Sequence, residues 1–124
     1  MNENTILAID VFDPEETLIT LLKNEGVEFK PRAKHPAVKI AKDETVDIIG
    51  NSHDASQISV LAAIFVEWLV ANDGRKMQAQ MKDCSIIYLE GYAVEDVIKI
   101  LTHTIKVIAF DPEYNHSIFR HQEN

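Results

Sequence analysis

The chain has 124 residues and a net charge of −8; 46% of the residues are hydrophobic and 26% are charged. This length and balance predict a single domain (1–124) with its own core and argue against wholesale disorder. Nucleic acid is not an expected partner, because phosphate binding needs an excess of lysine and arginine. The start of the chain does not look like a signal peptide, and no segment is long and apolar enough to span a bilayer. We therefore expect an acidic, cytoplasmic protein with no membrane partner.

The first elements are a buried strand and an amphipathic helix. Residues 6–12 form an apolar run that is typical of a strand. Asp13 is placed to cap a helix that begins at Pro14, because proline is well tolerated at a first helical position. Leu18, Leu21 and Leu22 would face the core, and the glycine at position 26 would end the helix.

A basic segment follows, from residue 30 to residue 42. Residues 27–33 alternate between apolar and charged side chains, and Pro31 places this strand at a sheet edge. The segment is a candidate surface for an anion or an acidic partner, formed by Lys30, Arg32, Lys34, Lys39 and Lys42. The alternative is that lysine and proline protect an outer strand against pairing with other sheets.

The middle of the chain contains a long helix with apolar residues on nearly every side. Short strands are expected at 37–41 and 45–49, separated by a turn at 42–44, and the helix is expected over 55–72. One side can cover a sheet, and the remaining apolar surface needs a second partner. We therefore predict a homodimer contact at Ile58, Leu61, Phe65, Trp68 and Leu69. Packing inside one domain explains Trp68 equally well.

A hairpin is expected after the long helix. Residues 76–82 alternate strictly, with Met77, Ala79 and Met81 on the inner face. Residues 85–90 return after a tight turn, and their apolar side chains on both faces suggest a strand that is covered on both sides or lies at the centre of the sheet. An alternative function follows from this hairpin: a small-molecule site or a small active site between 76–90 and 55–72, lined by Met77, Met81, Tyr88 and Trp68.

The last elements are a helix from residue 94 and a strand at 106–110, a segment that also fits a continuation of the helix. The words Phe12-Asp13-Pro14-Glu15 and Phe110-Asp111-Pro112-Glu113 recur after apolar runs. Aspartate followed by proline is a common way to open a helix, and this explains the repeat without a functional role. Residues 115–124 are expected to form a partly ordered tail.

No pattern of residues predicts catalysis. The five histidines never fall at the spacing of metal ligands. Cys84 lies next to Asp83, whereas a reactive thiol needs neighbouring positive charge. Tyr88, Glu90 and Tyr92 could line a pocket, although strand alternation makes Tyr88 a packing residue and Glu90 a solvated one. We expect no cofactor, no metal site and no enzymatic activity.

The order of elements in the second half resembles the effector-associated constant component proteins of bacterial conflict systems. The resemblance covers about residues 58–102 and rests on Trp68-Leu69, Gly74-Arg75-Lys76, Asp83, Leu89-Glu90-Gly91, and Val94, Val97 and Leu101. The chain departs from that family just before the long helix, where a segment bearing glycine and methionine is replaced by Asp47-Ile48-Ile49-Gly50. The resemblance implies a bacterial, non-enzymatic accessory adaptor and supplies no catalytic residues.

The sequence thus predicts a two-layer α+β domain in which a mixed sheet of about five strands packs against two or three helices, with the long apolar helix at the centre. The predicted function is a non-catalytic interaction module of the adaptor, immunity or regulatory type. The expected partners are a second copy of the chain and an unidentified protein.

Overall fold

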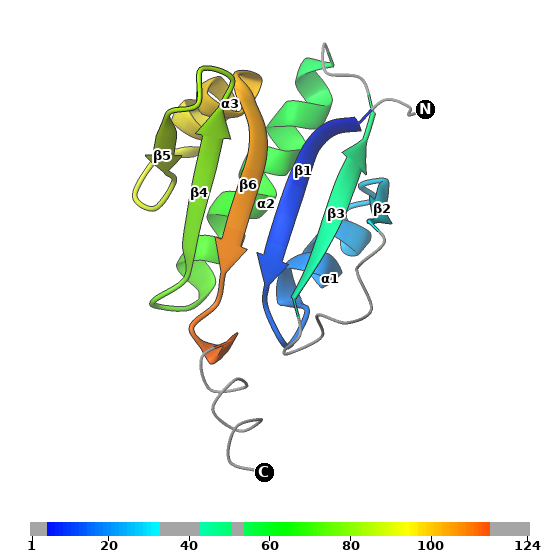
Figure 1. The fold of residues 1–124 in the computed structure, drawn as a ribbon, viewed down its shortest axis with the longest axis vertical. Coiled ribbons are helices and arrows are strands. Elements are labelled where there is room, and N and C mark those ends of the chain that lie inside the picture. The colour runs from blue at the N-terminus through cyan, green and yellow to red at the C-terminus, as the bar shows by residue number, and fades with distance from the viewer. Residues whose placement is uncertain (1–4, 33–42, 51–53, 115–124) are drawn as a thin grey trace.

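The computed structural model describes residues 5–32, 43–50 and 54–114, and the expected strand at 37–41 and the tail at 115–124 lie outside them. The fold is α+β, with one mixed six-stranded sheet rather than about five strands (Figure 1). The elements are β1 (Thr5–Phe12), α1 (Thr17–Asn24), β2 (Phe29–Pro31), β3 (Asp43–Ile49), α2 (Ala55–Ala71), β4 (Lys76–Met81), β5 (Ile86–Tyr88), α3 (Val94–Thr102) and β6 (Thr104–Phe110).

The strand order is β2-β3-β1-β6-β4-β5, so the first and last strands of the chain meet at the centre of the sheet. β1 and β6 are parallel, and the other neighbouring pairs are antiparallel. The segment at 106–110 is therefore a strand, as expected. β2 and β5 are the two edge strands.

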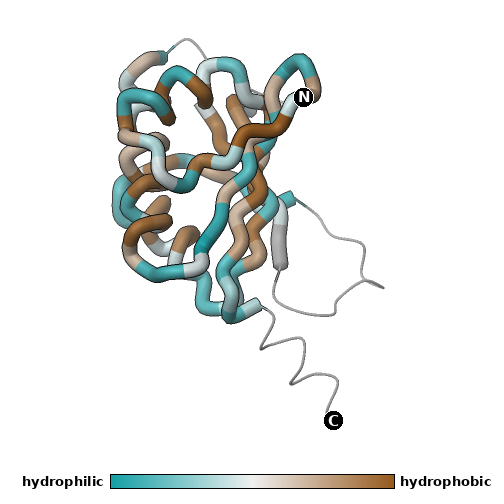
Figure 2. Tube along the Cα trace, turned by 90° about the vertical axis from the view of Figure 1, so that its left-hand side faces the viewer, coloured by the Kyte–Doolittle hydropathy of each residue, from teal (hydrophilic) through white to brown (hydrophobic). Residues whose placement is uncertain are grey.

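The three helices cover one face of the sheet, with α2 between α1 and α3 (Figure 1). A view turned by 90° shows the helical layer on one side of the strands (Figure 2). Buried apolar side chains from both layers form one core, because alternate residues of each central strand point toward the helices. We call the opposite side of the sheet the open face, since no described helix covers it.

On the open face, residues that are register partners in neighbouring strands form rows across the sheet. One row joins Lys30, Asp47, Ala8, Lys106, Gln80 and Ile86; the next joins Thr45, Asp10, Ile108, Gln78 and Tyr88. Asp10 lies in the middle, where it accepts a hydrogen bond from the Thr45 hydroxyl at 2.7 Å and pairs with the Lys106 ammonium at 2.9 Å. The centre of this face is therefore polar and internally paired.

Helix α1 begins at Thr17, later than predicted. The N-cap position is Glu16 rather than Asp13, although the Asp13 carboxylate still reaches the first turn, where it accepts hydrogen bonds from the Thr17 hydroxyl and the Leu18 amide. Residues 13–16 form a turn in which Glu16 adopts a left-handed conformation with φ 59°. The turn separates Pro14 from the helix, so the proline does not occupy the first helical position. Gly26, with φ +75°, follows the helix end as expected.

Two predictions about strands are wrong. β5 is an edge strand and not a covered, central one. Its Ile86 and Tyr88 side chains are each 55% exposed, because the open face has no second layer at this edge. Asp43 and Glu44 belong to β3 rather than to a turn, since their backbones pair with Phe12 and Val11 of β1.

Candidate functional site

Four of the five residues predicted to form a dimer contact lie in the core of this chain. Ile58, Leu61, Phe65 and Trp68 are buried, and Leu69 is half-buried against the same cluster. α1 and α3 cover the two sides of α2 that the sheet leaves uncovered. These four side chains therefore offer no surface to a second copy, and this corrects the location predicted for the contact. The large apolar residues of α2 that are exposed are Val60 and Val70.

The predicted basic surface is described only at Lys30 and Arg32, and Lys34, Lys39 and Lys42 lie outside the described residues. Arg32 follows the edge strand β2, and its guanidinium forms an ion pair with Asp47 on the open face. The hydrogen bond and the charge of this carboxylate raise the pKa of Arg32. Together with Pro31, these cations disfavour pairing of another strand with the β2 edge, which agrees with the interpretation that they protect an outer strand.

The alternative pocket between the hairpin and the long helix does not assemble from its predicted residues. Met77 and Trp68 are fully buried in the core, whereas Tyr88 projects from the open face of β5. The four side chains thus lie on different sides of the sheet. Met81 is half-buried, and its sulfur lies 3.4 Å from the Thr104 hydroxyl oxygen.

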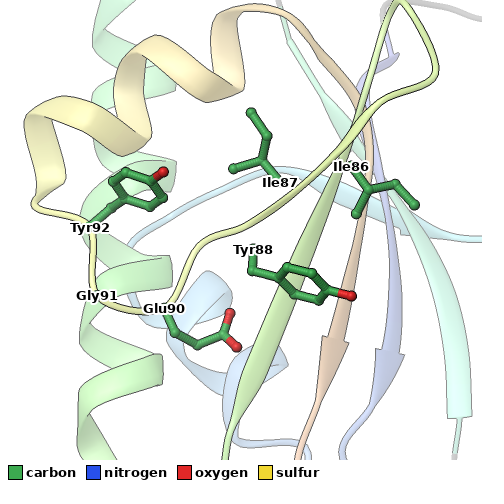
Figure 3. A pocket seen from close by; sticks show the side chains of 6 residues that line it. All are labelled: Ile86, Ile87, Tyr88, Glu90, Gly91 and Tyr92. Carbon is green, nitrogen blue, oxygen red and sulfur yellow. The ribbon is translucent and has the colours of Figure 1, made fainter.

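A different hollow lies at the β5 edge, and it contains the three residues that the sequence grouped. It has a volume of about 520 Å³ and is lined by Ile86, Ile87, Tyr88, Glu90, Gly91 and Tyr92. In Figure 3, Ile87 and Tyr92 point toward the space beside α3, and Tyr88 projects from the other side of the strand. Strand alternation explains this division.

The polar side chains of this hollow are one carboxylate and two phenols. The Glu90 carboxylate accepts a hydrogen bond from the Met77 amide at 3.3 Å, so it turns back against β4. The other polar side chains are two phenols, on Tyr88 and Tyr92. Tyr92 is 44% exposed. Tyrosine is enriched at protein interfaces relative to the rest of the surface.

The backbone of β5 has unused hydrogen-bonding capacity. The Ser85 carbonyl accepts a hydrogen bond from the Met81 amide of β4, and the Leu89 amide donates a hydrogen bond to the Met77 carbonyl of β4. Because bonding directions alternate along an antiparallel strand, the amides and carbonyls of Ile86 and Tyr88 point away from β4. In the described part of the chain nothing bonds to them. The edge of β5 is thus open, and none of the three residues of β5 is charged, in contrast to the β2 edge.

A buried polar cluster lies at the carboxyl ends of β1 and β6. Arg75 donates from Nε to Asp111 at 2.7 Å, from Nη1 to the Trp68 carbonyl at 2.8 Å and from Nη2 to the Thr17 hydroxyl at 3.1 Å. Its guanidinium also lies 4.5 Å from the centre of the Trp68 ring. Thr17 receives a further bond from the Trp68 indole and donates to Asp13. The cluster joins three loops to α2.

The two copies of the Phe-Asp-Pro-Glu segment lie side by side at this cluster. Phe12 and Phe110 are register partners in β1 and β6, and the Asp111 amide donates to the Phe12 carbonyl at 2.9 Å. Asp13 and Asp111 are both buried, and the backbone carbonyl of each accepts a hydrogen bond from the amide three residues later, at Glu16 and at Tyr114. The repeat therefore ends two adjacent parallel strands in the same way. Sequence reasoning missed Arg75, whose signal is a basic residue directly after Gly74 between helix and strand.

The remaining candidates show no reactive arrangement. Cys84 is exposed and lies in the β4–β5 turn with φ 74°, which fits the predicted tight turn. Within the described ranges no group of three histidine, cysteine, aspartate or glutamate residues is arranged to hold a metal ion. His103 is exposed at the end of α3, and the other four histidines lie outside the described residues.

Comparison with known protein families, curated proteins and solved structures finds no match for this chain. The resemblance to effector-associated constant component proteins accordingly stays a prediction. In the described residues, no helix is long and apolar enough to cross a membrane.

Proposed function

We propose that this protein is a non-catalytic interaction module that forms a homodimer through the edge of β5. The observation that supports this proposal is that exposed apolar side chains are concentrated at the unprotected edge of β5. Ile86, Tyr88 and Tyr92 are half of the large apolar residues that are exposed in the described part of the chain. Exposed strand edges without charges or proline pair readily with other strands.

The sequence of β5 favours a second copy of the chain as the partner. A twofold axis through Ile87 would set Ile86 of one copy opposite Tyr88 of the other, in antiparallel orientation. These are the residues whose backbone groups point outward, so each pair can exchange both of its hydrogen bonds. An aromatic residue opposite a β-branched residue is also a favourable cross-strand pair. The two sheets would then continue into one another.

The short strand limits the strength of this association. β5 has three residues, so the backbone pairing is brief and the interface falls at the small end for protein pairs. We therefore expect a dimer that dissociates on dilution. A weak, reversible contact suits an adaptor or regulatory protein, whose partners change. The prediction of an accessory adaptor is compatible with this behaviour.

Sedimentation velocity across low to high micromolar protein tests the proposal. The wild-type chain should shift from monomer toward dimer with concentration. Tyr88→Lys should remain monomeric, because it places a charge in the pairing row. Val70→Lys is the matched control, since Val70 is 76% exposed on α2 and far from the edge in sequence and fold. This control should dimerise like the wild type.

Ile86→Pro separates strand pairing from a simple apolar patch. Proline removes an amide that points away from β4, so the hairpin keeps its own hydrogen bonds while the edge loses a donor. Ile86→Ala removes apolar area but keeps the amide. Strand pairing predicts that the proline variant is monomeric and that the alanine variant still dimerises at high concentration. A wild-type monomer at every concentration, or equal dimerisation of Tyr88→Lys and Val70→Lys, would refute the proposal.

A further inference from the structure

A cleft opens between the two central strands at their amino-terminal ends. β1 and β6 pair from Ala8 and Lys106 onward, and the residues before them make no register pairs with each other. The pairing of β1 with β3 shifts register between Thr5 and Leu7, and that of β4 with β6 shifts between Gln80 and Met81. Such irregularities bend strands, and β1 visibly curves away from β6 here (Figure 1).

The cleft has an apolar floor beneath a cationic rim. Its volume is about 370 Å³, and Ile58 of α2 and Leu101 of α3 lie at the helical side. Arg32 contributes from the β2 flank and Lys82 from the β4 flank. None of the lining residues is acidic, although the chain has 20 aspartates and glutamates against 12 lysines and arginines.

The two cations differ in how available they are. Arg32 is already bonded to Asp47. Lys82 is exposed, and no described carboxylate pairs with it. Two of the three threonines of the cleft are committed elsewhere, because the Thr102 hydroxyl donates to the Ile98 carbonyl and the Thr104 hydroxyl donates to the Ile100 carbonyl. These bonds reach the Ile98 and Ile100 carbonyls in the last turns of α3. Lys82 is thus the main charged contact that the cleft offers.

We propose that this cleft binds a small amphipathic anion, with its apolar body against Ile58 and Leu101 and its acidic group at Lys82. Ligand sites are typically concave and mostly apolar, with a few polar groups that fix orientation. The cleft is concave and has a volume in the range of small-molecule sites, and its exposed lining is about half polar and half apolar. The site is separate from the β5 edge, so it does not depend on the proposed dimer.

Anilinonaphthalene sulfonate is a suitable probe, because it combines apolar rings with one anionic group and fluoresces when shielded from water. The wild-type protein should show saturable binding. Lys82→Glu should weaken it about tenfold, since reversal removes one attraction and adds a repulsion of similar size. Lys99→Glu, at an exposed lysine of α3 outside the cleft, should change the affinity less than about twofold.

Competition and two further variants complete the test. Decanoate should displace the probe and decylammonium should not, because only the carboxylate complements Lys82. Ile105 is 46% exposed and lines the cleft, so Ile105→Trp should block binding while leaving the core intact. Tyr88→Lys should bind normally, which excludes the β5 edge as the probe site. Near-ultraviolet circular dichroism must show native packing in each variant, since loosely packed states also bind this dye.

Three results would overturn the inference. The first is an absence of saturable binding to the wild type. The second is that Lys82→Glu and Lys99→Glu bind the probe with equal affinity. If Lys82→Glu fails to fold, an unchanged affinity of Ile105→Trp for the probe takes its place. The third is displacement by decylammonium as effective as that by decanoate.

Discussion

Replacing Arg75 with methionine should destabilise the fold strongly. The Arg75 and Asp111 side chains are only 4% and 8% exposed, and the guanidinium satisfies Asp111, the Trp68 carbonyl and the Thr17 hydroxyl together. Methionine fills a similar volume but donates no hydrogen bond. The Asp111 carboxylate would then stay buried beside an apolar group, without its cation.

The expected cost follows from the burial of the ion pair. Removing one partner of a buried, hydrogen-bonded pair typically costs about 3–5 kcal/mol, because the other charge remains desolvated. For a chain of this length, that corresponds to a fall in Tm of roughly 10–20 °C. Lys99→Met is the matched control, since Lys99 is exposed on α3, and we expect a change below about 0.5 kcal/mol.

Urea unfolding followed by tryptophan fluorescence measures this cost, because Trp68 is the single tryptophan and lies against Arg75. A double variant, Arg75→Met with Asp111→Leu, isolates the effect of the stranded charge. It should regain much of the stability that the single variant loses, because both charges are gone. A loss below about 1 kcal/mol in Arg75→Met, or a double variant no more stable than the single one, would contradict this reasoning.

Two further predictions concern turns. Gly74 has φ +88°, and a Cβ there would lie 3.0 Å from the Pro112 ring, whereas Gly26 has φ +75° and open space around it. Gly26→Ala should therefore lower the free energy of unfolding only by the backbone strain, about 1–2 kcal/mol. Gly74→Ala should lower it by more in the same urea experiment, because the added Cβ also meets the Pro112 ring. Equal losses in the two variants would show that the Pro112 ring shifts at no cost. Hydrogen bonds from the Ser85 hydroxyl and amide lower the pKa of Asp83. A lowered pKa in the folded state means that this stabilisation is present above the unfolded pKa and is lost as pH falls through the folded pKa. Ser85→Ala should raise the pKa of Asp83 in an NMR titration of its carboxyl carbon, and an unchanged titration would assign the shift to the backbone alone.

Strict periodicity and turn residues predicted several elements correctly. The alternation over 76–82 matches β4, the apolar run over 55–72 matches α2, and Pro31 marks an edge strand. Each of these signals is local: it depends on a few neighbouring side chains and on backbone preferences that are the same in any fold.

Sequence reasoning failed where a property depends on neighbours in space. The apolar surface of α2 suggested a partner because the chain does not reveal that α1 and α3 both pack against the same helix. The apolar residues on both faces of β5 suggested a central strand, yet the order of strands leaves it at the edge. Neither arrangement has a signature in the residues concerned.

The candidate sites show the same contrast between what local sequence indicates and what the tertiary structure decides. The sequence by itself determined that this is an acidic α+β chain with a long apolar helix, and it grouped Tyr88, Glu90 and Tyr92 near one strand end. Only the tertiary structure placed the two Phe-Asp-Pro-Glu words side by side around Arg75, and only it opened the cleft between β1 and β6. Both features join residues nearly a hundred positions apart, so they arise from the order and register of the strands and not from local preference.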